Sequence, residues 1–262
     1  MFKASIKTTL IDLSGTLHIE DSPIFGAVEA LEKLRKYTNV RFVTNTTKES
    51  INKLHGRLLK CGFKIEKDEI FTSLSSARKL IESEKLRPFL ILDDDAMEDF
   101  EGIETSNPNA VVIGLAPKKF NNETMNKAFR LIKDQNAQLI AIHKGRYYQK
   151  NDGLHLGPGA YVTGLEYSTG IQAKVVGKPN RMFFEMALSS LKSENNSFEN
   201  TVMIGDDVND DVIGAIENGL NAILVKTGKY REGDEIKIPI DNRNVVKSFV
   251  EAVELIVNHV KQ

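Results

Sequence analysis

Short runs of β-branched and aliphatic residues recur along the whole chain and are typical of buried strands. They lie at residues 8–13, 40–44, 89–92, 110–114, 138–142, 202–205 and 221–225. Between them, apolar residues recur with helical spacing, as at Val28, Leu31 and Leu34 or in the C-terminal run from Phe249 to Val260. Strands that alternate with helices favour parallel sheets joined by crossover helices. The pattern therefore predicts an α/β fold.

A second domain is expected as an insertion. The chain has 262 residues, the length of one large domain or of two unequal ones. It contains no internal repeat, low-complexity tract or charge block that would mark a linker. The boundaries are expected near residues 72–74 and 174–177, because the segment between them carries its own series of strands and helices.

Composition narrows the class of protein. There are 35 basic and 36 acidic residues, and 41% of the chain is hydrophobic, as in an ordinary globular protein. This balance argues against disorder and against nucleic-acid binding. Cys61 is the single cysteine, so an intramolecular disulfide and a Cys/His zinc cluster are excluded. No apolar run suits a signal peptide or a membrane span. We expect a cytoplasmic protein without nucleic-acid or membrane partners.

Asp12 ends the first predicted strand, and Gly15 permits a sharp turn directly after it. Ligands bind beyond the carboxyl ends of parallel strands, where a carboxylate can act as a nucleophile or a metal ligand. A helix or turn cap explains an aspartate here equally well from this motif alone.

Polar residues 44–47 end the strand at 40–44, and helical spacing begins at Lys48. Their hydroxyls and main-chain amides could hold a phosphate at a helix N-terminus. Plain capping of that helix by Thr46 or Thr47 is the alternative.

Lys178 follows the apolar Val175 and Val176 and precedes a helix expected near Asn180. The motif is no P-loop, because Pro179 stands where Ser or Thr is required and Gln172 where a glycine is required. A lone lysine is more often a solvated surface charge.

A dense acidic cluster follows the strand at 202–205, with aspartates at positions 206, 207, 210 and 211. Like charges this close repel unless a cation compensates them. An EF-hand is excluded, because Val212 and Asn218 stand where its glycine and its bidentate glutamate are required. Mg²⁺ held by one or two carboxylates fits better, and a solvated turn that caps the next helix is the alternative.

The four motifs stand at predicted strand ends in the order Asp, Thr, Lys, Gly-Asp-x-x-x-x-Asp, a combination far rarer than any member. On these motifs the chain resembles the haloacid dehalogenase superfamily over essentially its whole length. The resemblance implies a Rossmann-like parallel-sheet core of residues 1–73 and 177–262. It also implies an α/β cap domain inserted at residues 74–176.

The resemblance further implies a role for each matching residue. Asp12 matches the nucleophile, which forms an aspartyl-phosphate and binds Mg²⁺. Ser14 matches a position whose main-chain carbonyl ligates the metal, and Leu13 lies between them in the substrate-binding loop. Asp206 matches the second metal carboxylate. Asp211 matches an outer acidic residue of the metal site, which orients the lysine or a metal-bound water.

Phosphate binding is implied for the remaining motifs. Thr44 and Asn45 match the phosphate-binding strand end, which we extend to Thr46. Lys178 matches the catalytic lysine that neutralises the phosphate. Phosphoryl transfer requires that the charge of the phosphoryl dianion is neutralised, which Mg²⁺ and Lys178 would do. It also requires a nucleophile in line with the leaving group, which Asp12 would supply.

Ser14 departs from the family pattern. The residue two after the nucleophile is usually a second aspartate, which acts as general acid and base in phosphatase members. A serine hydroxyl is a poor proton donor, so a contribution of ~10²- to 10⁴-fold is expected to be missing. We therefore predict a preference for good leaving groups, as in phosphoramidates, pyrophosphate or aryl phosphates, over alkyl phosphomonoesters.

Cationic and aromatic side chains after the strand at 138–142 are candidates for substrate recognition in the cap. They are His143, Lys144, Arg146, Tyr147 and Tyr148, of which Arg146 and Tyr147 are the expected substrate-binding residues. A purely structural loop is the alternative.

The sequence thus predicts a Mg²⁺-dependent phosphohydrolase that acts on a small phosphorylated molecule. The alternative is a catalytically weak phospho-ligand binding or regulatory protein, although such a protein has no need of the nucleophile Asp12. A dehalogenase is disfavoured because Asp206 and Asp211 look like a magnesium site. The apolar stripe of the C-terminal helix is either core or partner surface, which leaves a homodimer open.

Overall fold

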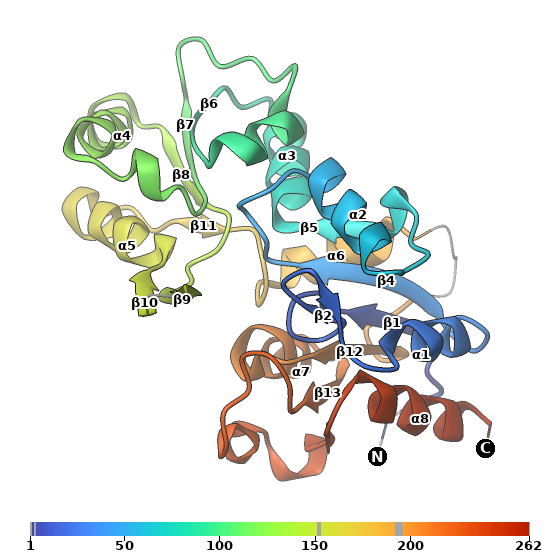
Figure 1. Ribbon diagram of the computed structural model, residues 1–262. Coiled ribbons are helices and arrows are strands. Elements are labelled where there is room, and N and C mark those ends of the chain that lie inside the picture. Colours follow the sequence, from blue (N-terminus) through green and yellow to red (C-terminus); the bar gives the residue numbers. More distant parts are fainter. Residues whose placement is uncertain (1, 3, 151–152, 192–195, 262) are drawn as a thin grey trace. The chain divides into compact units, whose positions relative to one another are not determined.

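A computed structural model describes residues 2, 4–150, 153–191 and 196–261 (Figure 1). The chain forms two compact units. The first comprises Met1–Thr44, Asn52–Phe71 and Lys178–Gln262, and the second comprises Asn45–Ile51 and Thr72–Gly177.

The first unit contains a six-stranded sheet in the order β14-β13-β12-β1-β4-β5. Its strands are β1 (Thr8–Ile11), β4 (Asn39–Thr44), β5 (Ile70–Thr72), β12 (Thr201–Gly205), β13 (Asn221–Val225) and β14 (Val245–Val246). Strand β1 runs parallel to both of its neighbours, so Ile11 lies beside Ile204 and Phe42. The pairs β12–β13 and β13–β14 are also parallel. The predicted parallel α/β fold is confirmed.

Among the residues that the structure describes, five helices belong to this part of the chain. They are α1 (Ala27–Leu34), α2 (Ile51–Lys60), α6 (Arg181–Ser189), α7 (Gly214–Glu217) and α8 (Phe249–Val260), with a π-helical turn η4 (Val208–Ile213) before α7. Short 3-10 helices lie at Lys67–Glu69, Asp234–Lys237 and Ile240–Asn242, and a small hairpin joins β2 (His18–Ile19) to β3 (Ser22–Pro23). This hairpin was not predicted.

Both faces of the six-stranded sheet are covered. Successive residues of a strand point to opposite faces. Leu10 and Met203 pack with apolar residues of α6 and α7 on one face. Ile11 and Ile204, which point to the other face, are also 0% exposed. Helix α8 contacts β13 and β14 and packs against α1, as Figure 1 shows.

The apolar stripe of the C-terminal helix is core. Phe249, Ala252, Val253 and Ile256 of α8 are all buried within the chain. These four residues therefore belong to the core, while Val250 and Val260 at the two ends of the stripe are half-buried. Within the described ranges, none of the helices combines the length and apolar character that a bilayer crossing requires.

The second unit has its own four-stranded sheet in the order β11-β8-β7-β6, with parallel pairs throughout. Its strands are β6 (Pro88–Ile91), β7 (Ala110–Ile113), β8 (Gln138–Ala141) and β11 (Lys174–Val175). Its helices are α3 (Ser73–Ser83), α4 (Asn122–Gln135) and α5 (Pro158–Thr169), with 3-10 helices at Asp94–Phe100 and Pro117–Lys119. Helices α4 and α5 pack side by side and share one core with the sheet (Figure 1). A hairpin of β9 (Tyr147–Lys150) and β10 (Gly153–Leu156) completes the unit.

One local expectation is wrong. The helix expected from Lys48 begins at Ile51, whose N–H donates to Oδ1 of Asp99 at 3.0 Å. Asp99 therefore takes the capping role that was considered for Thr46 or Thr47. Strand β11, which precedes Lys178, pairs with β8 in the smaller sheet. Short apolar runs do not reveal which sheet a strand joins.

Candidate active site

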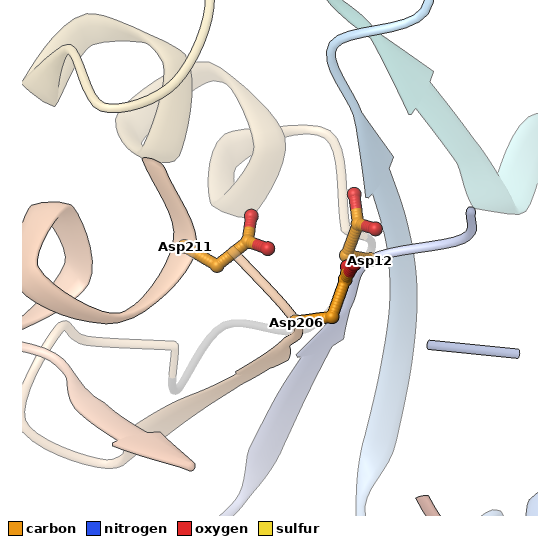
Figure 2. Close-up of side chains that lie close together, drawn as sticks. All are labelled: Asp12, Asp206 and Asp211. Carbon is orange, nitrogen blue, oxygen red and sulfur yellow. The ribbon is translucent and has the colours of Figure 1, made fainter. Parts of the chain in front are cut away.

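Three carboxylates meet at the carboxyl edge of the six-stranded sheet. One oxygen of each of Asp12, Asp206 and Asp211 lies within 4.8 Å of the other two (Figure 2). Asp12 directly follows β1 and Asp206 directly follows its neighbour β12, while Asp211 comes from the π-helical turn η4. All three residues are buried, with 7%, 1% and 2% of their surface exposed.

Lys178 lies among these carboxylates. Its Nζ donates to Oδ1 of Asp12 at 2.6 Å and to Oδ1 of Asp211 at 2.7 Å. It also donates to the main-chain oxygen of Val43, at 3.3 Å. Burial opposes the charge of Lys178, but the two carboxylates outweigh burial and raise the pKa of the ammonium. Lys178 thus stays protonated and supplies a fixed positive charge.

Asp206 is held by two donors. Its Oδ1 accepts the hydroxyl of Thr16 at 3.3 Å, and its Oδ2 accepts the main-chain N–H of Lys229 at 2.6 Å. Burial and the charge of Asp12 together raise the pKa of Asp206 to about 7. The cluster therefore holds more negative charge than Lys178 compensates.

Both oxygens of Asp211 are engaged by the protein. Oδ1 accepts Lys178, and Oδ2 accepts the N–H of Asp207 at 3.1 Å. Burial raises the pKa of Asp211 even though Lys178 acts against the shift. A Cβ at Gly205 would lie 2.2 Å from Oδ2 of Asp211, so only glycine lets this carboxylate fold back over β12.

The turn-cap alternative holds for Asp207. Its Oδ1 accepts the N–H groups of Asn209 and Asp210, each at 3.0 Å, and so caps the π-helical turn. Its Oδ2 pairs with Nζ of Lys229 at 3.1 Å. Of the four aspartates in the motif, Asp207 caps the turn, Asp206 and Asp211 are the two buried carboxylates of the site, and Asp210 is half-buried.

The turn after Asp12 is compact. The main-chain oxygen of Leu13 accepts the N–H of Leu17 at 2.8 Å, and Leu13 itself is buried. Ser14, which lies in this turn, is exposed. Gly15 has a φ of +90°, and a Cβ there would lie 2.2 Å from Oδ2 of Asp206. The glycine is therefore required by both the turn and the neighbouring carboxylate.

The predicted phosphate-binding residues are divided between the two units. Thr44 is the last residue of β4, which neighbours β1, and is buried in the first unit. Asn45 and Thr46 are half-buried and belong to the second unit, where the Ser73 hydroxyl donates to the main-chain oxygen of Thr46 at 3.3 Å.

In the second unit, some residues of the loop after β8 contact other parts of the unit, and others are exposed. The ammonium of Lys144 lies 2.7 Å from Oε2 of Glu166, which is buried in α5. His143 Nε2 lies 3.3 Å from the hydroxyl of Thr47. Arg146 and Tyr147, in contrast, are exposed. Lys144 and His143 thus have structural contacts within the unit.

The sequence did not assign a role to Thr16 or to the segment Thr227–Lys229. The Thr16 hydroxyl and the main-chain N–H of Lys229 both donate to Asp206, and the Thr227 hydroxyl donates to the main-chain oxygen of Gly15. The sequence contained one feature by which the segment could have been found. The segment follows β13, which neighbours β12, and it contains a glycine between polar residues. Its relevance depends on strand order, which the sequence pattern does not give.

Two family models match the chain. A model described as haloacid dehalogenase-like hydrolase matches residues 9–105, and one described as HAD-hydrolase-like matches residues 175–252.

Individual proteins are similar over nearly the full length. The chain is 55% identical over 258 residues to haloacid dehalogenase-like hydrolase domain-containing protein 2 of Bos taurus, covering 98% of each chain. It is 38% identical to phospholysine phosphohistidine inorganic pyrophosphate phosphatase of Homo sapiens, covering 98% of this chain and 96% of that one. In structure it is similar to a 4-nitrophenylphosphatase of Thermotoga maritima, with a TM-score of 0.85, 25% identity and coverage of 95% and 97%.

Proposed function

Since the chain belongs to the haloacid dehalogenase-like hydrolase family, as its motifs predict, we propose that it is a Mg²⁺-dependent phosphohydrolase with Asp12 as nucleophile. The observation that carries the proposal is the buried contact of Asp12 with Lys178, beside a second carboxylate on the neighbouring strand. The names of the relatives support phosphate-ester, phosphoramidate or pyrophosphate chemistry.

Asp12 and Lys178 divide the work of phosphoryl transfer. A carboxylate oxygen of Asp12 attacks phosphorus and the bond to the leaving group breaks, after which the leaving group takes any proton that it needs from solvent water. Water then cleaves the aspartyl-phosphate, which releases inorganic phosphate and restores Asp12. The fixed charge of Lys178 offsets the charge of the phosphoryl group throughout, and Asp211 holds the lysine in place through a 2.7 Å contact.

The donor set fits a hard divalent cation. Carboxylate oxygens are the ligands that Mg²⁺ prefers. Burial and neighbouring carboxylates raise the pKa values of Asp206 and Asp211, and a cation beside them would stabilise their charged forms. Asp12, Asp206 and the main-chain carbonyl of Ser14 would hold the ion. Asp211, whose Oδ1 accepts a hydrogen bond from Lys178, would complete the metal site as the outer acidic residue that orients Lys178 or a metal-bound water. When bound, Mg²⁺ would supply further positive charge to the phosphoryl oxygens.

Ser14 supports the preference for good leaving groups. It is exposed beside Asp12 and occupies the position that would otherwise carry a general acid. A P–N bond, pyrophosphate or an aryl ester needs little help from an acid when it breaks, and an alkyl ester needs much. The 38% identical relative is named for phospholysine, phosphohistidine and pyrophosphate, which is the same class of leaving group.

Substrate recognition completes the proposal. Residues 74–176 would serve as the cap over the core of residues 1–73 and 177–262, and the separate sheet and core of the second unit support this assignment. Arg146 and Tyr147, which are exposed, would contact the substrate. Leu13, Ser14, Thr44, Asn45 and Thr46 would line the phosphate through their main chain and hydroxyls.

The test is phosphate release from a panel of substrates, with and without Mg²⁺, by the unaltered chain and by Asp12→Asn. The panel contains pyrophosphate, a phosphoramidate, an aryl phosphate and several sugar or nucleotide monoesters. Metal-dependent turnover that Asp12→Asn abolishes would support the enzyme. Metal-dependent binding of a phosphorylated ligand without turnover of any substrate would favour the binding or regulatory protein instead.

A further inference from the structure

The segment Thr227–Lys229, which follows β13, lies directly against Asp206. We infer that this segment positions the Asp206 carboxylate and thereby sets the affinity of the site for its divalent cation. The inference rests on the proposed function, because it takes Asp206 as a metal ligand.

Two hydrogen bonds fix the segment. The main-chain N–H of Lys229 donates to Oδ2 of Asp206 at 2.6 Å, and the Thr227 hydroxyl donates to the main-chain oxygen of Gly15 at 2.5 Å. The segment therefore joins Asp206 to the turn that follows Asp12. Groups that orient a metal ligand in this way commonly change metal affinity by about 10- to 100-fold when they are removed.

Two glycines enclose the same carboxylate. Gly228 has a φ of +53°, and a Cβ there would lie 2.2 Å from Oδ2 of Asp206 and 2.5 Å from Cα of Gly15. A Cβ at Gly15 would also lie 2.2 Å from Oδ2 of Asp206. Since the obstacle at Gly228 is the carboxylate itself and the backbone of Gly15, a methyl group at Gly228 must displace Asp206 or the turn.

The main chain and the side chain of Lys229 have different partners. The main-chain N–H contacts Asp206, whereas Nζ pairs with Asp207 at 3.1 Å. A positive side chain near a cation site weakens cation binding by repulsion, while the N–H orients a ligand. Removing only the charge of Lys229 should therefore leave Mg²⁺ affinity the same or raise it.

The experiment compares Gly228→Ala with Gly233→Ala. Gly233 is a matched control because it also has a positive φ, +93°, but a Cβ there meets nothing within 4 Å. The Mg²⁺ dissociation constant is measured on chelator-treated protein from the rise of the melting temperature with added MgCl₂. We expect the Mg²⁺ dissociation constant to increase about tenfold or more in Gly228→Ala and to change less than about twofold in Gly233→Ala.

Two further variants keep the inference falsifiable. Thr227→Val removes the hydroxyl that holds Gly15 without changing backbone freedom at Gly228, and it should also weaken Mg²⁺ binding. If Gly228→Ala does not fold, the Mg²⁺ dissociation constant of Thr227→Val tests the inference in its place. Lys229→Met should not weaken binding.

The outcomes separate the inference from the proposed function. If the unaltered chain shows no shift of melting temperature with Mg²⁺, the metal site and the inference both fail. If the unaltered chain binds Mg²⁺ and Gly228→Ala binds it as well as Gly233→Ala does, the inference alone fails. A loss in Lys229→Met as large as that in Gly228→Ala would also overturn it, because the lysine side chain and not the segment's main chain would then act on Asp206.

Discussion

The ammonium of Lys178 lies 2.6 Å from Oδ1 of Asp12, and the two side chains are only 2% and 10% exposed. An ion pair this deeply buried gains less from its own attraction than it costs when one partner is removed. The remaining charge then stays in a low-dielectric surrounding without compensation. The pair therefore has consequences for stability as well as for chemistry.

Lys178→Met should lower the free energy of unfolding by about 3–5 kcal/mol, because it leaves Asp12 and Asp211 buried without their countercharge. Urea unfolding at neutral pH measures the loss. Lys226→Met is the control: Lys226 pairs with Glu235 at 2.9 Å, but the two side chains are 40% and 24% exposed. Breaking such a surface pair costs about 0–1 kcal/mol. Equal losses in the two variants would contradict the expectation.

Asp12→Asn should reduce phosphate release by at least on the order of 10³-fold, because an amide oxygen is no substitute for the attacking carboxylate. Steady-state turnover of an aryl phosphate with Mg²⁺ measures the change. Asp234→Asn is the control, since Asp234 pairs with Lys237 at 2.7 Å outside the acidic cluster. Turnover that survives in Asp12→Asn would assign the nucleophile to another group.

Ser14→Asp should raise the kcat/KM for an alkyl phosphomonoester by about 10²- to 10⁴-fold, because it restores a group that can protonate the leaving oxygen. The informative quantity is the ratio of alkyl to aryl phosphate turnover, since an aryl leaving group gains little. Ser14→Ala, which has no acid at this position, should leave the ratio unchanged. If Ser14→Asp also leaves it unchanged, the serine does not explain the leaving-group preference.

Glu166 should contribute a pH dependence to the stability of the second unit. Burial opposes its charge, but hydrogen bonds from Lys144 and from the N–H of Ala173 outweigh burial, so the pKa of Glu166 is lowered. A lowered folded-state pKa gives stability that is present above the unfolded-state value, about 4.3, and that is lost as the pH falls through the folded-state value.

We therefore expect Glu166→Gln to be less stable than the unaltered chain at pH 7, by about 2 kcal/mol, and to lose less stability between pH 6 and pH 3. Urea unfolding across this range measures both. Glu185→Gln serves as the control, because the Arg181–Glu185 pair is 60% and 52% exposed and should keep the pH slope of the unaltered chain. The same slope in all three proteins would show that Glu166 has no such role.

The sequence could predict the strands that carry Asp12, Thr44 and Asp206, because apolar runs ended by polar residues are local features. Their convergence followed from one general rule, that carboxyl ends of parallel strands meet at one edge. The structure adds that β1 lies between β12 and β4, which is why these residues are neighbours. The sequence pattern contains no such order.

Contacts between distant side chains were beyond the sequence pattern. In the sequence, Lys144 and Arg146 are both cations in the loop after β8, but only the fold shows that Glu166 of α5 lies beside Lys144. The sequence assigned no role to the segment at Thr227 and Gly228, because nothing in it resembles a catalytic motif. Its contact with Gly15 joins residues 212 positions apart. Local pattern predicts where a chain turns, and tertiary packing decides what the turn touches.

The points where the chain passes between the two units have a consequence for engineering. Thr44 is the last residue of one stretch of the first unit, and Lys178 is the first residue of another. The segment from Thr72 to Gly177 therefore ends one peptide bond before Lys178. A chimera that exchanges this segment for that of a relative would keep Asp12, Lys178, Asp206 and Asp211 on the recipient scaffold, yet its new junction would fall on the peptide bond before Lys178. The design of such a splice must preserve the backbone path into that lysine before any new specificity can be judged.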